Sequence, residues 1–432
     1  MKVMWVCNTA NQDVYRYKGK GYVTGGGWLT GLSESLKSIS ELELVYCYPS
    51  TNSGVQDDFV YDGVHYYSFF SPLQYPILNK LGVSSPQKQK ESKLQNEQLE
   101  HILSVEKPDI VHIFGTEFYH SHAIADIAEG KSKLVCSIQG LTYYIAEHYL
   151  SLIPSEEYNK INVSSIFRGT LKQQCRKLEK RGKDEIYTIN KCGNIIGRTT
   201  WDRSCTYFIN QKRRYFHCDE VLRPEFYNEK QWNFSCCKKH SIFISQASSP
   251  LKGFNIVVEA VAILKNEFPD LEVRVAGNNF ISKDSILDRL KISTYGVYIR
   301  KIIERNKLVN NIHFIGTLNA DEMIREYMNC NVFISASSIE NSPNSVGEAM
   351  VLGVPIISSD VGGIKSLMVE DEEGLYYPAD EYYILADKIR TIFLNNLYAK
   401  KLGDKARLHA KEIFDSEKNA KRLVEIYKEL MK

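Results

Sequence analysis

Residues 337–363 read SSIENSPNSVGEAMVLGVPIISSDVGG, and this stretch decides how the rest of the chain is interpreted. Ser342-Pro343 suits the N-cap and first position of a helix, because proline lacks the N–H that would be unpaired there. Gly353, with a proline shortly after it, suits the end of that helix. The stretch therefore predicts a loop that carries Glu340, a helix that carries Glu348 and then a buried strand.

The start of such a helix has partial positive charge and unpaired backbone N–H groups, which suit a phosphate. In open α/β sheets, ligands bind at the carboxyl ends of the strands, where this helix would begin. Carboxylates suit sugar hydroxyls, so Glu340 and Glu348 predict a ligand with phosphate in its middle and a hydroxylated ring at each end. That description fits a nucleotide-sugar. The alternative is an ordinary helix cap between two solvated glutamates.

Outward from this stretch, apolar runs alternate with amphipathic helical patterns, which predicts an α/β protein with largely parallel sheets. The pattern breaks at residues 213–239 and then restarts, so the 432 residues predict two Rossmann-like domains. We expect residues 1–225 to form the first domain, 226–410 the second, and 411–432 an amphipathic C-terminal helix. The expected strands are 3–7, 42–48, 110–114, 134–138 and 195–196, then 242–245, 271–276, 312–315, 332–335 and 355–358.

The composition is that of a soluble globular protein, with 43% hydrophobic and 25% charged residues. A net charge of +2 gives no reason to expect a nucleic-acid partner. Ten cysteines without a C-x-x-C pair indicate reduced thiols rather than disulfides or a zinc ribbon. No apolar run has the length of a signal peptide or a membrane span. We therefore expect a cytoplasmic protein, with any membrane contact peripheral and at the inner face of the cell membrane.

The combination of motifs resembles the signature of the retaining glycosyltransferases of family four, which have the GT-B fold. That signature has a Glu, seven residues, a second Glu-Ala and then Gly-x-Pro, as in Glu340, Glu348-Ala349 and Gly353-Val354-Pro355. Lys252-Gly253 resembles the Lys-Gly after the first strand of the family's C-terminal domain. Order and spacing agree over residues 240–390, whereas Gly25-Gly26-Gly27 gives a looser match in the N-terminal half.

The resemblance implies two Rossmann-like domains that face each other across a cleft, with the last helix, 411–432, crossing back to the first domain. It implies transfer of a sugar from a UDP- or GDP-sugar to a hydroxyl of a glycan or lipid-linked acceptor in polysaccharide biosynthesis. Glu340 and Lys252 would be catalytic, with Glu340 on the donor sugar and Lys252 on the diphosphate, and Glu348 would bind the ribose. The family is described as reacting on one face of the sugar, with the leaving phosphate accepting the acceptor proton. Further donor contacts are implied for Asn341, Ser342, Pro343, Asn344, Ser345, Gly253, Gln139, Gly26 and Gly27.

Two positions depart from the family pattern. Ala247 stands where an Arg is common, which removes one phosphate charge, and Gln139 stands where a His is common. No Asp-x-Asp is present, so we expect neither a metal nor another cofactor, and fixed charges would stabilise the leaving diphosphate. The departures leave a non-catalytic nucleotide-sugar or glycan-binding protein open. A sugar-nucleotide epimerase of the same fold is a further alternative, although it would need acidic and His residues in the cleft.

A basic segment lies in the first half, where residues 168–214 contain thirteen Lys/Arg against four Asp/Glu. Such a segment favours attraction to an anionic membrane surface or to a lipid-diphosphate acceptor. The alternative is the solvated face of a helix that packs through Phe167, Leu171 and Leu178. We expect His112 to be a buried strand residue rather than a metal ligand.

Overall fold

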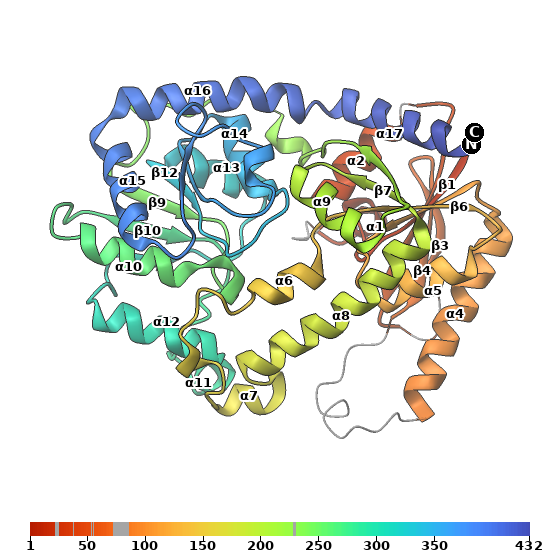
Figure 1. The fold of residues 1–432 in the computed structure, drawn as a ribbon, viewed down its shortest axis with the longest axis horizontal. Coiled ribbons are helices and arrows are strands. Elements are labelled where there is room, and N and C mark those ends of the chain that lie inside the picture. The colour runs from red at the N-terminus through yellow and green to blue at the C-terminus, as the bar shows by residue number, and fades with distance from the viewer. Residues whose placement is uncertain (22–25, 38, 53, 55, 72–85, 228–229) are drawn as a thin grey trace. The chain divides into compact units, whose positions relative to one another are not determined.

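The computed structural model describes residues 1–21, 26–37, 39–52, 54, 56–71, 86–227 and 230–432. The chain forms two compact units, each an α/β layer structure with its own core (Figure 1). Unit 1 comprises Met1–Tyr143, Glu179–Val221 and Asp415–Lys432, and unit 2 comprises Tyr144–Leu178 and Leu222–Phe414.

This division differs from the expected boundary at 225/226, chiefly because Tyr144–Leu178 belongs to unit 2. Leu152 and Leu171 are buried in the core of unit 2, and Asn255 Nδ2 donates to the Leu152 carbonyl oxygen at 2.7 Å. A segment expected in the first domain therefore folds with the second.

Unit 1 is built on an eight-stranded sheet in the order β3-β4-β2-β1-β5-β6-β7-β8, parallel except for the β3–β4 pair. Its central strands are buried on both faces, which is why they read as continuous apolar runs rather than alternating ones. The strands are β1 (Lys2–Val6), β2 (Glu43–Ser50), β3 (Asp58–Tyr61), β4 (Val64–Phe70), β5 (Ile110–Phe114), β6 (Lys133–Ser137), β7 (Asn194–Gly197) and β8 (Arg214–His217).

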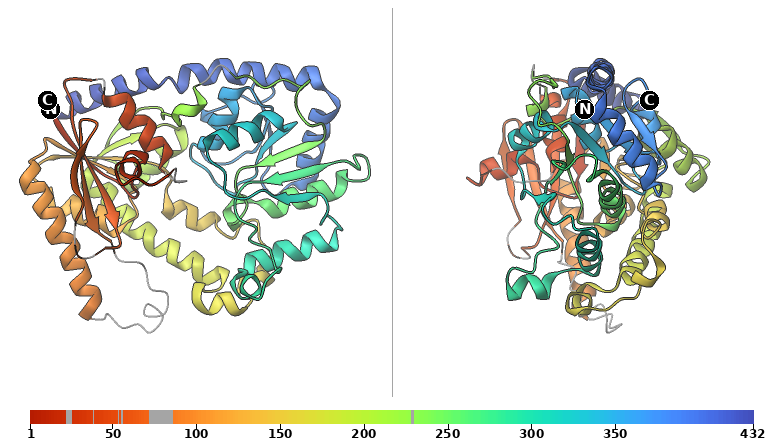
Figure 2. Two further views of the ribbon diagram at one scale, coloured as in Figure 1. Left: turned by 180° about the vertical axis from the view of Figure 1, so that it is seen from behind. Right: turned by 90° about the vertical axis from the view of Figure 1, so that its left-hand side faces the viewer.

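Helices flank this sheet on both sides (Figure 2). The last helix of the chain contributes to the unit 1 core, because Leu423 and Tyr427 are buried there. Tyr427 hydroxyl accepts from Trp5 Nε1 at 2.9 Å and lies 2.6 Å from His112 Nδ1. The helices are α1 (Gln12–Tyr17), α2 (Gly27–Lys37), α4 (Pro86–Glu106), α5 (Tyr119–Ile127), α9 (Thr200–Ile209) and α17 (Ser416–Met431), with α6 (Thr142–His148) and α8 (Leu171–Cys192) shared with unit 2.

Unit 2 is built on a six-stranded parallel sheet in the order β11-β10-β9-β12-β13-β14. The strand order reverses between β9 and β12, so the connections leaving these two strands diverge there. A reversal of this kind opens a crevice at the carboxyl edge of an α/β sheet. The strands are β9 (Ser241–Ile244), β10 (Glu272–Val275), β11 (Ile312–Phe314), β12 (Val332–Ser335), β13 (Ile356–Ser359) and β14 (Leu375–Tyr377).

Two of the unit 2 helices follow the strands at which the strand order reverses. α10 follows β9 and is buried along most of its length, and α14 follows β12 and is buried from Val346 to Leu352. The helices are α7 (Val163–Arg168), α10 (Phe254–Leu264), α11 (Ile286–Lys291), α12 (Thr294–Arg305), α13 (Ala320–Asn329), α14 (Asn344–Leu352), α15 (Tyr382–Leu394) and α16 (Asn396–Ile413).

All ten cysteines are free thiols, and seven of them are buried, with Cys236 exposed and Cys175 and Cys237 half-buried. Among the described residues, no helix has both the length and the apolar character needed to cross a lipid bilayer.

Candidate functional site

The loop and helix after β12 form the centre of the candidate site. α14 begins at Asn344, and Pro343 is its N-cap residue with φ −72° and ψ 121°. The expectation that Ser342 caps the helix and Pro343 opens it is therefore wrong by one position, because the extended ψ of Pro343 places it before the first turn. The first turn still presents backbone N–H groups that the helix itself does not pair. The predicted helix end is confirmed, since Gly353 adopts the left-handed conformation with φ 71°.

Lys252 and Glu340 meet across the reversal of strand order. Lys252 follows β9 and Glu340 follows β12, and Lys252 Nζ donates to Glu340 Oε1 at 2.6 Å. Ser337 Oγ donates to the same carboxylate oxygen at 2.7 Å. The side chains of Lys252 and Glu340 are 29% and 17% exposed, respectively, so a ligand can reach this pair. The structure thus brings together the two residues that the sequence names as catalytic.

Two glycines allow the segments that carry this pair to approach closely. Gly253 has φ 58°, and a Cβ there would lie 1.9 Å from the Ala336 carbonyl oxygen. Gly362 has φ 53°, and a Cβ there would lie 2.0 Å from the Glu340 carbonyl oxygen. The Glu340 carbonyl oxygen also accepts from the Gly363 N–H at 2.9 Å. Gly253 therefore has a steric role, which holds the Lys252 turn against the end of β12.

Glu348 lies on the buried face of α14 and is held by a residue that sequence reasoning missed. Arg223 donates to Glu348 Oε1 from Nε at 2.8 Å and from Nη2 at 2.7 Å. Tyr327 hydroxyl donates to Oε2 at the longer distance of 3.4 Å. Burial raises the pKa of Glu348, and the Arg223 guanidinium opposes that rise. The carboxylate has one oxygen committed to the ion pair and one that is weakly held.

The sequence held only a weak signal for Arg223, which lies in the segment where the periodic pattern breaks before Pro224. Ala247, at the position where a cation was missing, is buried in the core of unit 2. The remaining predicted donor residues of unit 2 lie around the start of α14: Asn341 is buried, and Ser342, Pro343, Asn344 and Ser345 are half-buried.

The glycine loop and Gln139 belong to unit 1. Gly26 has φ 65°, and a Cβ there would meet Thr9 Cγ2 at 2.9 Å and the Ala10 carbonyl oxygen at 3.0 Å. Only glycine fits this approach to the segment after β1. Gly27 is the first residue of α2, and Gly25 lies outside the described residues.

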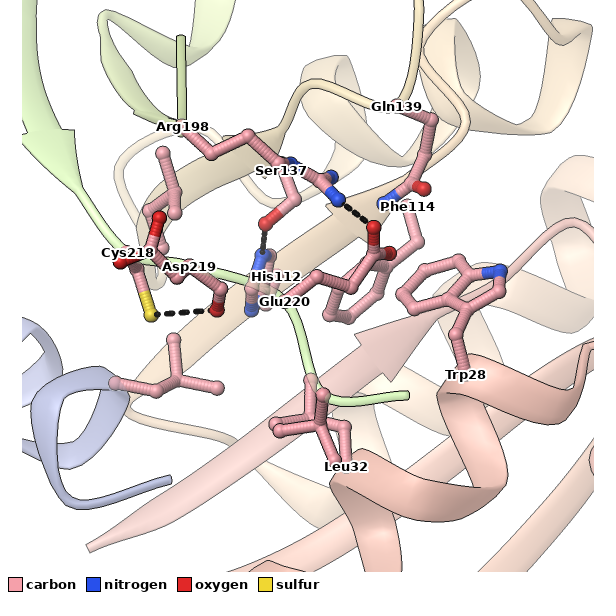
Figure 3. A pocket seen from close by; sticks show the side chains of 13 residues that line it. Trp28, Leu32, His112, Phe114, Ser137, Gln139, Arg198, Cys218, Asp219 and Glu220 are labelled. Carbon is pink, nitrogen blue, oxygen red and sulfur yellow. Dashed lines mark hydrogen bonds and ion pairs between the residues drawn. The ribbon is translucent and has the colours of Figure 1, made fainter. Parts of the chain in front are cut away.

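Gln139 lines a cavity of about 30 Å³ at the carboxyl edge of the unit 1 sheet (Figure 3). Arg198 and Glu220 point toward each other over this cavity and form a buried ion pair, and Arg198 Nη2 also donates to the Ile138 carbonyl oxygen at 2.8 Å. Glu220 Oε1 has no hydrogen-bond partner among the described residues. A buried carboxylate oxygen without a partner is uncommon and suggests that a polar group enters the cavity.

His112 also lines this cavity and is a buried strand residue, which confirms the expectation from the sequence. Its Nε2 lies 2.7 Å from Ser137 Oγ, and its Nδ1 lies beside Tyr427. Burial lowers the pKa of His112 to about 3, so the ring is neutral at physiological pH. Both ring nitrogens are engaged in holding α17 and β6 to β5.

Comparison with known proteins adds the family context. Residues 229–409 match the family model described as Glycosyl transferases group 1. The chain is 24% identical over 180 residues to a D-inositol 3-phosphate glycosyltransferase of Corynebacterium urealyticum. That alignment covers 42% of this chain and 41% of the relative, so the chain spans less than half the length of this curated relative.

Solved structures resemble the chain over nearly its full length. Sucrose-phosphate synthase from Thermosynechococcus elongatus superposes with a TM-score of 0.69 at 14% identity, covering 99% of this chain and 98% of that one. HepE of Anabaena, solved in complex with UDP-glucose, superposes with a TM-score of 0.64 at 15% identity, covering 99% and 100%. The chain therefore has the GT-B fold.

Proposed function

We propose that the protein is a retaining glycosyltransferase that moves a sugar from a nucleotide-diphospho-sugar to a hydroxyl of a glycan or lipid-linked acceptor. The observation that carries the proposal is the Lys252–Glu340 pair beside the start of α14, at the reversal of strand order in unit 2. The match to Glycosyl transferases group 1 spans residues 229–409 and includes all of these groups. The UDP-glucose complex of HepE, a structure of the same fold, supports a UDP-sugar as the donor.

In the proposed reaction, the sugar leaves its diphosphate and bonds to the acceptor. The acceptor oxygen bonds to the anomeric carbon while the bond from that carbon to the β-phosphate oxygen breaks, and this phosphate oxygen accepts the acceptor proton. Negative charge grows on the diphosphate, where Lys252 and the backbone N–H groups of α14 would stabilise it. Glu340 accepts from Lys252 Nζ at 2.6 Å, and this contact orients the lysine side chain. Glu340 would then bind the donor-sugar hydroxyls.

The nucleoside end of the donor would lie near Glu348. Its Oε1 is occupied by Arg223, so we assign ribose binding to Oε2, which holds Tyr327 only at 3.4 Å. Arg223 would therefore act as a positioning residue that fixes the carboxylate.

We place the binding of the acceptor hydroxyl in unit 1. A cavity of about 30 Å³ has room for one or two water-sized groups, so only a hydroxyl or a similar small end of the acceptor would enter it. Glu220 Oε1 would accept a hydrogen bond from that group.

A thermal-shift screen tests the donor, because a ligand that binds only the folded state raises the melting temperature. We expect a UDP- or GDP-sugar to raise it, slow release of the nucleoside diphosphate without acceptor, and the same rate with EDTA. Loss of activity in EDTA that a divalent cation restores would contradict the metal-independent mechanism. Binding without any release would instead support a non-catalytic nucleotide-sugar-binding protein.

Variants of the ion pair test the site itself. We expect Glu340→Gln and Lys252→Met each to lower nucleoside diphosphate release by about 10²- to 10³-fold, the usual effect of removing one transition-state contact. The matched control is Glu372→Gln, which removes another Lys–Glu pair of unit 2, with Lys405 at 2.8 Å. Full turnover in Glu340→Gln would exclude the proposed role. Retention is checked by the anomeric configuration of the first product, measured by NMR.

A further inference from the structure

The short helix α7 exposes its apolar face to solvent. Val163, Ile166 and Phe167 share one face by their i, i+3, i+4 spacing, and all three are exposed, with Ile166 at 56% and Phe167 at 50%. The opposite face places Ser164 and Ser165 in the interior. This order is the reverse of an ordinary surface helix, whose apolar stripe faces the core. Of the three residues expected to pack a solvated helix, Leu171 is buried and Leu178 is half-buried, whereas Phe167 is exposed and does not pack in the interior.

The neighbouring helix α11 repeats this arrangement. Ile286 and Leu290 are four residues apart on one face of α11 and are exposed, Ile286 at 76%. α7 and α11 lie against each other in unit 2, and Asn162 Nδ2 at the start of α7 donates to the Ile292 carbonyl oxygen after α11 at 2.8 Å (Figure 1). The exposed apolar residues on and just before these two contacting helices are Ile161, Val163, Ile166, Phe167, Ile286 and Leu290, and we refer to them as the α7–α11 patch.

Cations border the patch on the side where the chain enters α8. Residues 160–180 contain six Lys/Arg and one Glu. Arg168, Lys172, Arg176 and Lys177 are exposed, and none forms an ion pair within the part of the chain that the structure describes. Lys177 Nζ donates to the Arg168 carbonyl oxygen at 3.2 Å, which holds α8 beside the end of α7. Lys172 and Arg176 share one face of α8 by their i, i+4 spacing.

The acidic residues near the patch are Asp284 and Asp288, before and within α11. Ser282 Oγ lies 2.9 Å from Asp284 and 3.2 Å from Asp288, and Asp288 also accepts from the Ser285 N–H at the start of α11. Lys283, Arg289 and Lys291 belong to the same segment and offset these two carboxylates. The charge around the exposed apolar residues is therefore positive on the α7–α8 side and close to balanced at α11.

We propose that unit 2 docks on an anionic lipid bilayer through the α7–α11 patch. Aliphatic and phenyl side chains would enter the boundary between headgroups and acyl chains, and the Lys and Arg heads would remain at the lipid phosphates. Phe and Arg are common in protein interfaces as well, so Phe167 and the bordering arginines do not distinguish the two kinds of partner. The absence of Tyr and Trp from the patch and the presence of Lys172 and Lys177 beside it favour the lipid surface. This inference does not depend on the proposed sugar transfer.

Vesicle sedimentation of the full chain tests the proposal. The probes are vesicles of phosphatidylcholine with 30 mol% phosphatidylglycerol, and phosphatidylcholine vesicles as the neutral reference. We expect binding to the anionic vesicles to exceed binding to neutral ones and to weaken as salt rises. Equal binding to both, or to neither, would overturn the proposal.

Two pairs of variants separate the apolar and the charged contributions. Ile166→Ser/Phe167→Ser should lower partitioning onto anionic vesicles at least tenfold at every salt concentration, because that contribution is not screened. Lys172→Gln/Arg176→Gln should lower it by about fivefold per cation at low salt and by much less at high salt. The controls are Leu397→Ser/Leu408→Ser and Lys401→Gln/Lys411→Gln, which change exposed residues of α16 in the same unit.

The remaining outcomes each contradict the proposal. If the control pairs lose as much binding as the test pairs, attraction is general and the patch is not the docking surface. If Ile166→Ser/Phe167→Ser abolishes self-association in the absence of vesicles and leaves vesicle binding intact, the patch contacts a second copy of the chain. Donor hydrolysis should be unchanged in all four pairs, so failure of docking is distinguishable from failure of the proposed activity.

Discussion

At the residue scale, the ion pair between Arg223 and Glu348 shows how unit 2 fixes a carboxylate inside a helix. The side chains are 18% and 6% exposed, so both charges have lost most of their water. Arg223 also lies over the ring of Phe226, with its guanidinium carbon 4.7 Å from the ring centroid. A buried ion pair of this kind has a small net effect on the free energy of unfolding while it is intact, whereas removing one partner lowers that free energy strongly.

We expect Arg223→Ala to lower the free energy of unfolding by about 3–5 kcal/mol, because it leaves the buried Glu348 charge unpaired. Arg223→Ala/Glu348→Gln should recover part of that loss. The matched control is Arg274→Ala, since Arg274 also donates from two nitrogens to one carboxylate, that of Glu326, but its side chain is 30% exposed. Urea denaturation measures all three, and equal losses for Arg223→Ala and Arg274→Ala would contradict this account.

Glu185 is a second buried carboxylate, on the part of α8 that belongs to unit 1. It accepts from Thr116 Oγ1 at 2.9 Å and from the Tyr143 N–H at 2.9 Å, and thereby caps α6. Burial raises its pKa to about 7. The folded chain therefore binds this proton more tightly than the unfolded chain, in which the pKa is near the ordinary value for Glu.

We expect the contribution of Glu185 to stability to be fully present below about pH 4.5 and to be lost as pH rises through 7, because the ionised form is costly to bury. The loss could reach roughly 3 kcal/mol, at about 1.4 kcal/mol per unit of pKa shift. Glu185→Gln cannot ionise, so its stability relative to the parent should rise between pH 5 and pH 8. Urea midpoints at each pH measure this, with the exposed Glu179→Gln as control, and parallel curves for parent and Glu185→Gln would contradict it.

The residues of the candidate site differ in how well they could be predicted from the sequence. Lys252 and Glu340 belong to motifs with fixed spacing, so their meeting could be expected from the order of strands and turns. Arg223 could not be, because it reaches Glu348 from a segment 125 positions earlier that has no periodic pattern. The ion pair between Glu220 and Arg198 could not be predicted either, since only folding brings the end of β7 and the segment after β8 to one cavity.

At the element scale, the turn between β9 and α10 depends on a glycine for two separate reasons. Gly253 needs a left-handed conformation, and it also needs the absence of a Cβ against the Ala336 carbonyl oxygen. Gly316 shares the positive φ, at 79°, but a Cβ there would meet nothing within 4 Å. The two positions therefore separate conformational strain from steric overlap.

We expect Gly316→Ala to cost about 1 kcal/mol in unfolding free energy, from the left-handed conformation alone. Gly253→Ala should cost about 3 kcal/mol or more, because β12 and the Lys252 turn must also move apart. That movement would lengthen the Lys252–Glu340 contact, so nucleoside diphosphate release should fall as well. Calorimetry and the release assay measure both, and equal effects of the two variants would contradict the steric argument.

Sequence patterns located the buried parallel strands within one or two residues, because such strands are short apolar runs between turns. Ile110–Phe114 and Val332–Ser335 agree in both bounds. Four strands were not predicted: the edge strands β3, β8 and β14, and β4, which lies next to β3. Their sequences are short and rich in tyrosine and phenylalanine rather than aliphatic residues, so they do not stand out as aliphatic runs. The start of α14 was expected one position too early, at Pro343, because proline is common on either side of a helix start.

At the scale of the whole molecule, the chain passes from unit 1 to unit 2 and back twice, so neighbours in sequence can stabilise different units. Leu402 on α16 is buried in the core of unit 2, and Leu423 on α17 is buried in that of unit 1. The amphipathic pattern predicted the C-terminal helix, and the family resemblance implied its return to the first domain. The transfer of Tyr144–Leu178 to unit 2 was not, because a domain assignment from sequence follows the order of the chain.

We expect Leu423→Ala and Leu402→Ala each to cost about 2–5 kcal/mol, the range for truncating a buried leucine. Their effects should fall on different units. Hydrogen exchange read by peptide should show faster exchange in β1 and β5 for Leu423→Ala, and in β12 and β13 for Leu402→Ala. Loss of protection in both units from either variant would show that the cores are not separate.

The distribution of the ten thiols gives the native chain a convenient chemical handle. Seven are buried, and burial raises the pKa of the half-buried Cys237 to about 11, so these groups react slowly with alkylating reagents. Cys236 is exposed and lies in unit 2. A maleimide dye under brief labelling should therefore attach mainly there, and its anisotropy would report whether unit 2 engages a vesicle without any engineered cysteine.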